Sequence, residues 1–195
     1  FQSFALEIDP DEYVLDGVEK IWAFHDRSLM YRHACHHSTC GACGMRVNNR
    51  EYLTCITKIR DVTHNGGTIK VEPLRNFPIV SDLVVDFGDF FSKLDEVDCK
   101  HVQPVDSQPD KKGIKPSHRK AKPGTARLVD CLECGLCVSA CPASATNVEY
   151  LGPATLASVQ LKMIAEKEST VDVVDNENGL WRCHSAYECS EVCPS

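Results

Sequence analysis

The chain has 195 residues, which is enough for one large domain or two small ones. Its formal charge of −7 at pH 7 argues against nucleic acid as a partner. We find neither a signal peptide nor an apolar run that could cross a bilayer, so we expect no transmembrane segment of its own. The chain has twelve cysteines, and their close spacing favours metal binding in a reducing compartment over a disulfide framework.

The first hundred residues are expected to form a small β-rich domain. Alternating apolar side chains predict a strand over residues 4–8, and helical spacing predicts a helix over residues 17–26. Strands are predicted at residues 45–47 and 52–56 around Asn48-Asn49, a good hairpin turn, and at residues 68–72. Apolar residues at helical spacing then predict a long core-facing helix over residues 79–97.

The second half of the chain is expected to be mainly helical. Residues 100–123 lack apolar rhythm and are rich in proline and lysine, which indicates an interdomain linker. Helices are predicted over residues 126–134 and over residues 152–166, where Pro153 suits the first helical turn. Residues 171–174 are the one strand candidate here. We therefore predict an α+β chain with domains at residues 1–99 and 124–195.

Four cysteines in the second half follow the spacing C-x2-C-x2-C-x3-C-P, which is typical of bacterial ferredoxins; they are Cys131, Cys134, Cys137 and Cys141. A short loop brings the first three thiolates onto one iron–sulfur cluster. Pro142 then begins a helix, and the fourth cysteine serves a different cluster. The motif therefore predicts a second cluster whose remaining ligands lie elsewhere in the chain.

The last cysteines repeat this spacing with one substitution, because Ala186 stands where the second cysteine is expected. Alanine cannot bind iron, so the two motifs supply seven thiolates rather than eight. Exchange of the fourth ligands predicts one [4Fe–4S] cluster, bound by Cys131, Cys134, Cys137 and Cys193. Three ligands then remain for a [3Fe–4S] cluster, namely Cys141, Cys183 and Cys189. A labile [4Fe–4S] cluster with water or another side chain as its fourth ligand is the alternative.

An earlier cysteine group has the plant-type spacing for a [2Fe–2S] cluster, and its members are Cys35, Cys40, Cys43 and Cys55. Gly41 and Gly44 fit a loop that wraps tightly around sulfur. A Rieske centre would need a histidine three residues after Cys55, where Lys58 stands. We interpret His36 and His37 as loop residues near the cluster.

Structural zinc is disfavoured, because zinc sites close with four ligands and the eleven motif cysteines divide into four, four and three. The twelfth, Cys99, has no partner at motif spacing and is interpreted as a small buried apolar residue.

The order of these three motifs resembles the iron–sulfur subunit of succinate dehydrogenases and fumarate reductases. The resemblance extends over nearly the whole chain. Further matching segments are residues 14–16, 31–32, 53–57, 80–86, 150–154 and 181–184. It implies an N-terminal β-grasp ferredoxin domain of plant type, followed by an α-helical bacterial-type ferredoxin domain. It also implies a strand before Phe1 and a helical tail after Ser195.

The resemblance further implies a role in electron transfer without substrate chemistry of its own. Electrons would pass singly between an FAD-containing subunit and a membrane-anchor subunit with quinone or haem, with the Cys35 group nearest the flavin. The [3Fe–4S] cluster would lie nearest the membrane, with His184 a candidate on the quinone side. The complex would sit on the cytoplasmic face of a prokaryotic inner membrane or on the mitochondrial matrix face.

Two departures keep other functions open. His36-His37 stands where the family usually has Arg-Glu, and Ala145-Thr146 replaces a tryptophan of quinone-reducing succinate dehydrogenases. The same module could therefore serve a different flavoprotein, or the chain could be a free ferredoxin-like carrier.

Overall fold

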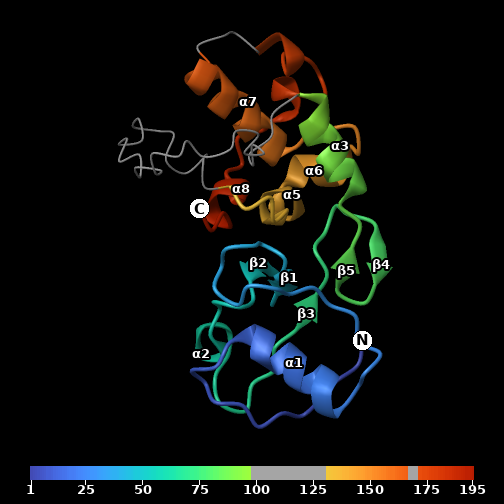
Figure 1. Ribbon diagram of the computed structural model, residues 1–195, viewed down its shortest axis with the longest axis vertical. Helices are drawn as coiled ribbons and strands as arrows, with labels where there is room; N and C mark the ends of the chain where they lie inside the picture. The colour runs from blue at the N-terminus through green and yellow to red at the C-terminus, as the bar shows by residue number, and fades with distance from the viewer. Residues whose placement is uncertain (98–130, 167–170) are drawn as a thin grey trace, which may run out of the picture.

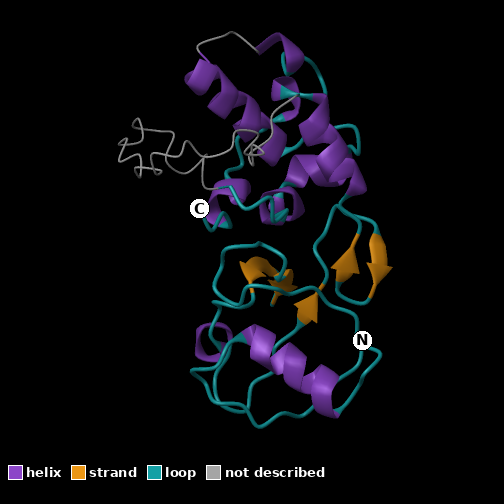
Figure 2. Cartoon of the chain, in the orientation of Figure 1, coloured by secondary structure: helices purple, strands orange, loops and turns teal. Residues whose placement is uncertain are grey.

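The computed structural model describes residues 1–97, 131–166 and 171–195 (Figure 1). Figure 2 shows that the strands all lie in one half of the molecule, whereas the other half is built from helices. The linker predicted over residues 100–123 and Cys99 lie outside the described residues. None of the helices in the described ranges is both long and apolar enough to cross a membrane.

A three-stranded sheet forms the centre of the first half, with β1 (Gly44–Val47) between β2 (Arg50–Leu53) and β3 (Val71–Glu72). Both neighbours pair with β1 in antiparallel orientation. Asn48 and Asn49 link β1 to β2 with φ angles of 50° and 71°, the left-handed conformation that a two-residue hairpin turn requires. The predicted hairpin is therefore confirmed, but its second strand, predicted at residues 52–56, runs from Arg50 to Leu53, and residues 54–56 form a turn. The strand predicted at residues 68–72 is confirmed over its last two residues.

Helix α1 (Val14–Phe24) covers the apolar side of this sheet. Val14 packs with Val47 and with Ile59, the first residue of the short helix α2 (Ile59–Val62). Asp16 accepts a hydrogen bond of 2.8 Å from the Tyr13 N–H and so satisfies a free donor at the start of the helix. The predicted helix is confirmed, although it begins three residues earlier than the pattern indicated.

The strand predicted over residues 4–8 is wrong, because the structure has no strand between residues 1 and 9. Leu6 and Ile8 instead lie against α1, where their side chains reach within 4.0 Å and 3.5 Å of a Cβ built on Gly17. Alternation marks a segment with one buried face. It does not supply the neighbouring strand edge that a ladder of hydrogen bonds needs.

The long helix predicted over residues 79–97 is wrong in its first half. Strands β4 (Ile79–Ser81) and β5 (Val84–Val85) form an antiparallel hairpin there, with Asp82 at a φ of 44° in the turn. The β-branched residues on both sides of this turn favour extended backbone. Only α3 (Gly88–Glu96) is helical, and it begins after the hairpin ends.

Helix α3 packs on the second half of the chain although it belongs to the first in sequence. Phe90 and Leu94 form a buried cluster with Ala154 of helix α7 (Pro153–Glu166). Phe87 lies edge-on to Phe90, with ring centroids 5.6 Å apart, and borders the same cluster. The predicted helix from Pro153 is confirmed.

The rest of the second half consists of short helices: α5 (Leu136–Ala140), α6 (Pro142–Thr146) and α8 (Glu188–Glu191). Two 3-10 turns, η1 (Val171–Val173) and η2 (Leu180–Arg182), lie between α7 and α8. The expectation of a mainly helical second half is thus confirmed for the described residues, and Pro142 begins a helix as predicted.

Two local predictions in this half are wrong. Residues 171–174 form a 3-10 turn rather than a strand. Residues 131–134, the described end of the helix predicted from residue 126, are not helical. Glu133 and Gly135 have φ angles of 52° and 75°, which a right-handed helix cannot include.

A buried polar contact joins the two halves. Glu51 of β2 is 4% exposed, and its Oε1 accepts a hydrogen bond of 2.8 Å from the Ser139 hydroxyl of α5. The Ser139 oxygen in turn accepts a 2.9 Å bond from the Arg75 N–H. The guanidinium groups of Arg46 and Arg75 both approach Glu51 Oε1 to 3.5 Å, so the carboxylate charge is compensated.

We predict that Ser139→Ala destabilises the protein by about 1–3 kcal/mol, because a buried carboxylate loses its hydroxyl donor. The exposed helical serine Ser92 provides the matched control, and Ser92→Ala should change stability by less than about 0.5 kcal/mol. Urea unfolding followed by circular dichroism would measure both. Equal midpoints for the two variants would contradict this account of the contact.

Candidate metal centres

The first cysteine group lies on the loop before β1 and just after β2. Backbone N–H groups of this loop point at sulfur: those of Thr39 and Cys40 lie 3.2 and 3.3 Å from Cys35 Sγ. The Ser38 N–H lies 3.4 Å from Cys55 Sγ. Positive φ angles at His36, Ser38 and Gly41 produce the tight turns that aim these donors inward. The loop is thus shaped to surround negatively charged sulfur.

The environments of these sulfurs differ strongly. Hydrogen bonds from the backbone N–H groups, that of His37 first, lower the pKa of the Cys35 thiol to about 6. Burial raises the pKa of Cys55 to about 12, and the nearby Cys43 and Cys35 sulfurs act in the same direction. The difference between these two pKa values has a simple cause. Backbone N–H donors stabilise the Cys35 thiolate, whereas Cys55 is desolvated beside sulfurs of like charge. The group can ionise fully only around a cation.

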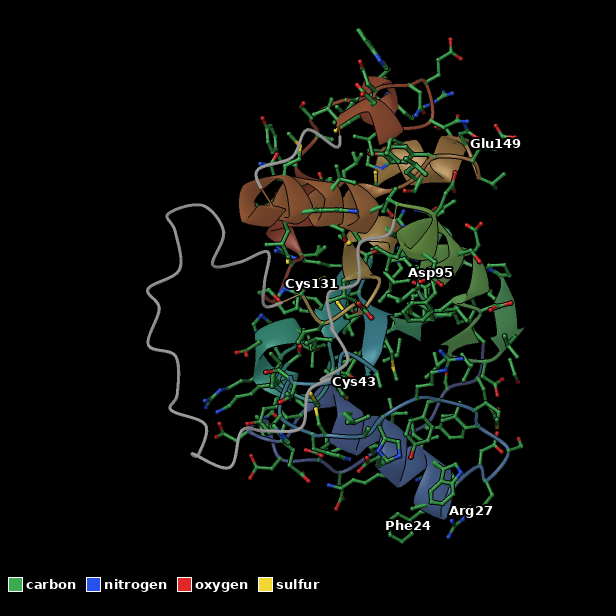
Figure 3. All side chains as sticks on the ribbon, turned by 45° about the horizontal axis from the view of Figure 1, so that its top comes forward. Phe24, Arg27, Cys43, Asp95, Cys131 and Glu149 are labelled. Atoms are coloured by element: carbon green, nitrogen blue, oxygen red, sulfur yellow. The ribbon has the colours of Figure 1, made fainter. Side chains whose placement is uncertain are left out.

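The second group combines residues from both ends of the helical half. Burial, and to a smaller extent the sulfurs of Cys131 and Cys193, raise the pKa of Cys134 to about 11. Desolvation of the Cys137 sulfur, together with the sulfurs of Cys134, Cys131, Cys193 and Cys189, also raises its pKa well above the usual value, although the residue as a whole is half-buried. Cys193 is therefore gathered with the first three cysteines of the other motif. Figure 3 places Cys131 near the helical half and Cys43 in the β-rich half.

The third group lies around a cavity of about 240 Å³. Cys141, Cys183 and Cys189 line it, together with Ala186 and Tyr150. Burial raises the pKa of the Tyr150 hydroxyl, and the sulfurs of Cys141 and Cys183 raise it further. A water molecule occupies roughly 30 Å³ in the liquid, so the cavity has room for a group several times larger than one water molecule or one metal ion.

The structure thus brings cysteines from distant segments together: Cys193 lies near Cys134, and Cys141 and Cys183 lie near Cys189. All eleven motif cysteines are free thiols, and Cys40, Cys183 and Cys193 are exposed. His184 lines the same cavity as the third group. Soft thiolate ligands suit iron–sulfur clusters, and the donors around Cys35 and Cys55 match the hydrogen bonds to sulfur that tune such clusters. The residues present therefore fit these cofactors.

Two groups close to the cysteines, the Ser38 N–H and the Tyr150 side chain, could not be recognised from sequence patterns. The Ser38 N–H is a backbone donor, and backbone donors leave no side-chain signature. Tyr150 lies between two cysteine segments only because the chain folds back on itself; it was noted solely within the matching segment at residues 150–154.

The first and second groups lie close together because their loops touch. Gly41 has a φ of 70°, and a Cβ built there would stand 2.7 Å from Cys134 Cβ and 2.9 Å from the Leu132 carbonyl oxygen. A Cβ on Gly44 would similarly approach Leu136 Cδ2 to 3.1 Å. The absence of side chains at these glycines allows one cysteine loop to rest on the other.

Two family models match the chain in succession. A 2Fe-2S iron-sulfur cluster binding domain matches residues 1–92, and a 4Fe-4S dicluster domain matches residues 127–195.

Curated relatives match over most of the chain. The fumarate reductase iron-sulfur subunit of Haemophilus influenzae is 33% identical over 98% of this chain and 79% of its own length. That of Mycobacterium tuberculosis is 33% identical over 100% of this chain and 79% of its own. The mitochondrial succinate dehydrogenase [ubiquinone] iron-sulfur subunit of Candida glabrata is 31% identical over 93% and 72%.

A solved structure is similar as well. A chain of the Mycobacterium smegmatis Sdh1 complex superposes with a TM-score of 0.73 at 26% identity, over 98% of this chain and 80% of that one. With a 2Fe-2S domain followed by a 4Fe-4S dicluster domain, and with relatives of this identity along its length, the chain belongs to the family of iron–sulfur subunits of fumarate reductases and succinate dehydrogenases.

Proposed function

We propose that this chain transfers single electrons between an FAD-containing subunit, which interconverts succinate and fumarate, and a membrane-anchor subunit with quinone or haem. The observation that supports this most directly is that cysteines from distant segments of one polypeptide lie near one another, Cys193 near Cys134 and Cys141 near Cys189. Each cluster, when bound, takes up and releases one electron at a time. No acid, base or nucleophile of the chain is needed for this task.

The ligand sets follow the crossed arrangement of the two later motifs. We assign the [2Fe–2S] cluster to Cys35, Cys40, Cys43 and Cys55. We assign the [4Fe–4S] cluster to Cys131, Cys134, Cys137 and Cys193. We assign the [3Fe–4S] cluster to Cys141, Cys183 and Cys189. The sulfurs of Cys131 and Cys193 raise the pKa of Cys134. Those of Cys141 and Cys183 raise the pKa of Cys189. Each set combines cysteines of both motifs, which supports this division.

The finer architecture is part of the proposal. Residues 1–99 would be a β-grasp domain of plant-ferredoxin type, residues 100–123 a linker, and residues 124–195 an α-helical ferredoxin domain of bacterial type. The sheet order β2-β1-β3 with α1 on one face supports the first assignment. Because α3 packs on α7, the end of the proposed first domain also contributes side chains to the core of the proposed second domain.

The protein residues tune and protect the clusters. N–H groups of the loop after Cys35 stabilise negative charge on sulfur, and Cys43, 2% exposed, and Cys55, 3% exposed, are shielded from water. Desolvation of the Cys137 sulfur acts in the same way in the second group, although the residue as a whole is half-buried. His184 lines the cavity of the third group and is the candidate residue on the quinone side. The complex would be peripheral to the membrane, on the cytoplasmic or matrix face.

Exposed apolar surface favours a fixed complex over a free carrier. Ile79 and Val80 of the β4–β5 hairpin are 64% and 65% exposed. Adjacent large apolar side chains on an edge hairpin are costly in a free monomer and are typical of an interface. We infer that this hairpin contacts a partner subunit.

The hairpin inference predicts that Val80→Glu weakens co-purification of the partner subunits about tenfold or more, because a charge is placed in an apolar contact. Val148, which is 82% exposed on a loop of the helical half, provides the matched control Val148→Glu. Quantitative mass spectrometry of complexes solubilised from native membranes would measure both. A flavin-free monomer from the wild-type chain would contradict the complex itself.

Intact chains are predicted to contain about nine iron atoms, the sum of clusters with two, four and three irons. Electron paramagnetic resonance should show a [3Fe–4S] signal in the oxidised protein and a [2Fe–2S] signal on reduction. Well under about nine irons in fully loaded protein would reject the ligand assignment.

Ala186→Cys is predicted to convert the three-iron centre into a four-iron one, because it restores the missing thiolate beside Cys183 and Cys189. The oxidised [3Fe–4S] signal should then disappear, and iron content should rise by one atom. Ala186→Ser, which adds a similar volume without a thiolate, should keep the signal. An unchanged signal in Ala186→Cys would show that this position does not face the cluster.

A further inference from the structure

Two histidines and a glutamate meet at the edge of the β-rich half, outside the cysteine groups. Glu19 Oε1 of α1 lies 3.3 Å from His33 Nδ1 and 3.4 Å from His36 Nε2. The two histidine nitrogens are 3.0 Å apart. The three atoms therefore form a nearly equilateral triangle, built from a helix, from the segment that leads into the first cysteine loop and from the start of that loop.

The Glu19 oxygen lacks the hydrogen bonds that its burial demands. Oε1 has less than 1 Å² of exposed surface and accepts no hydrogen bond from any residue in the described part of the chain. A buried carboxylate oxygen without a donor is costly unless a cation compensates it. The two imidazole nitrogens approach it at contact distance without the alignment of hydrogen bonds.

The triangle has the dimensions of a metal site. Zinc binds imidazole nitrogen and carboxylate oxygen at about 2.0–2.2 Å, and tetrahedral geometry then separates two ligand atoms by ~3.3 Å. The separations of 3.3, 3.4 and 3.0 Å match this spacing. A set of two histidines and one glutamate is moreover a ligand combination that zinc uses, with a fourth position left for water.

The histidine side chains are held in place by neighbours that do not compete for the metal. The His33 ring stacks on Tyr31 with an interplanar angle of 16° and centroids 5.1 Å apart. His36 has a φ of 59°, an uncommon conformation for a residue other than glycine. This backbone turn brings its ring edge-on to His33. Both rings are about 40% exposed, so an ion can enter from solvent.

We propose that Glu19, His33 and His36 bind one divalent transition-metal ion of the Zn²⁺ type, separate from the iron–sulfur clusters. The ion satisfies the buried Glu19 oxygen and joins α1 to the start of the first cysteine loop and to the segment before it. The rival arrangement is an ion pair in which a protonated histidine, rather than a metal, compensates the carboxylate.

The experiment titrates the untagged holoprotein, with its iron content verified, with ZnCl2. Isothermal titration calorimetry and elemental analysis after dialysis should give one zinc per chain in the wild type. Glu19→Gln and His36→Ala should weaken zinc binding at least about 100-fold, since removal of a direct ligand exceeds the 10–100-fold loss typical of outer contacts. His37→Ala is the matched control, because His37 is the adjacent histidine of the same loop and does not belong to the triangle.

X-ray absorption at the zinc edge identifies the ligands independently of any variant. Nitrogen and oxygen neighbours at about 2.0–2.2 Å are expected, whereas sulfur near 2.3 Å would place the zinc on cysteines and overturn the proposal. The proposal is likewise overturned if wild-type holoprotein takes up no zinc, or if His37→Ala weakens binding as much as His36→Ala. Glu19→Gln keeps the side-chain shape and changes no residue of the cysteine loop, so its result does not depend on an altered loop sequence.

Discussion

Helix α5 is the element on which the two later cysteine groups depend. It is only five residues long, and a helix of that length has little stability by itself. Contacts with α6, α7, α8 and β2 hold it. The Asn76 side chain also donates hydrogen bonds to the carbonyl oxygens of Val138, at 2.8 Å, and Cys141, at 3.2 Å. Because Cys137 lies within α5 and Cys141 at its end, fixing this helix orients one thiol toward each group.

Burial of sulfur links cofactor binding to folding. Without iron, Cys55, Cys134 and Cys137 must remain protonated, since burial raises the pKa of each thiol and neighbouring sulfurs add to the effect. A cluster needs these groups as thiolates, so its binding energy compensates their desolvation. Cys35 differs, because backbone donors lower its pKa to about 6 even without metal. It is therefore the thiol of its group that is most easily available as a first ligand.

The sequence was most informative where a residue type has a single chemical role. Cysteine spacing predicted ligand groups that span both later motifs, and the fold places Cys193 near Cys134. Asn48-Asn49 predicted the central hairpin because few residues accept its φ angles. Periodicity was less reliable. Apolar residues from Ile79 onward fit a helix and a hairpin alike, and the turn at Asp82 decided between them. Long-range contacts such as Glu51 with Ser139 could not be predicted, since neither residue has a distinctive pattern.

Gly41 shows how closely the cysteine loops constrain each other. Sequence reasoning explained this glycine by the tight wrapping of one loop, and its φ of 70° agrees. The structure adds a second requirement, because any Cβ would clash with Cys134 and with the Leu132 carbonyl of the other half. A larger side chain would therefore have to separate the two loops as well as strain its own backbone. The two halves of the described chain are thus in contact at the cysteine loops themselves, so one shared surface sets the relative positions of the first and second cysteine groups.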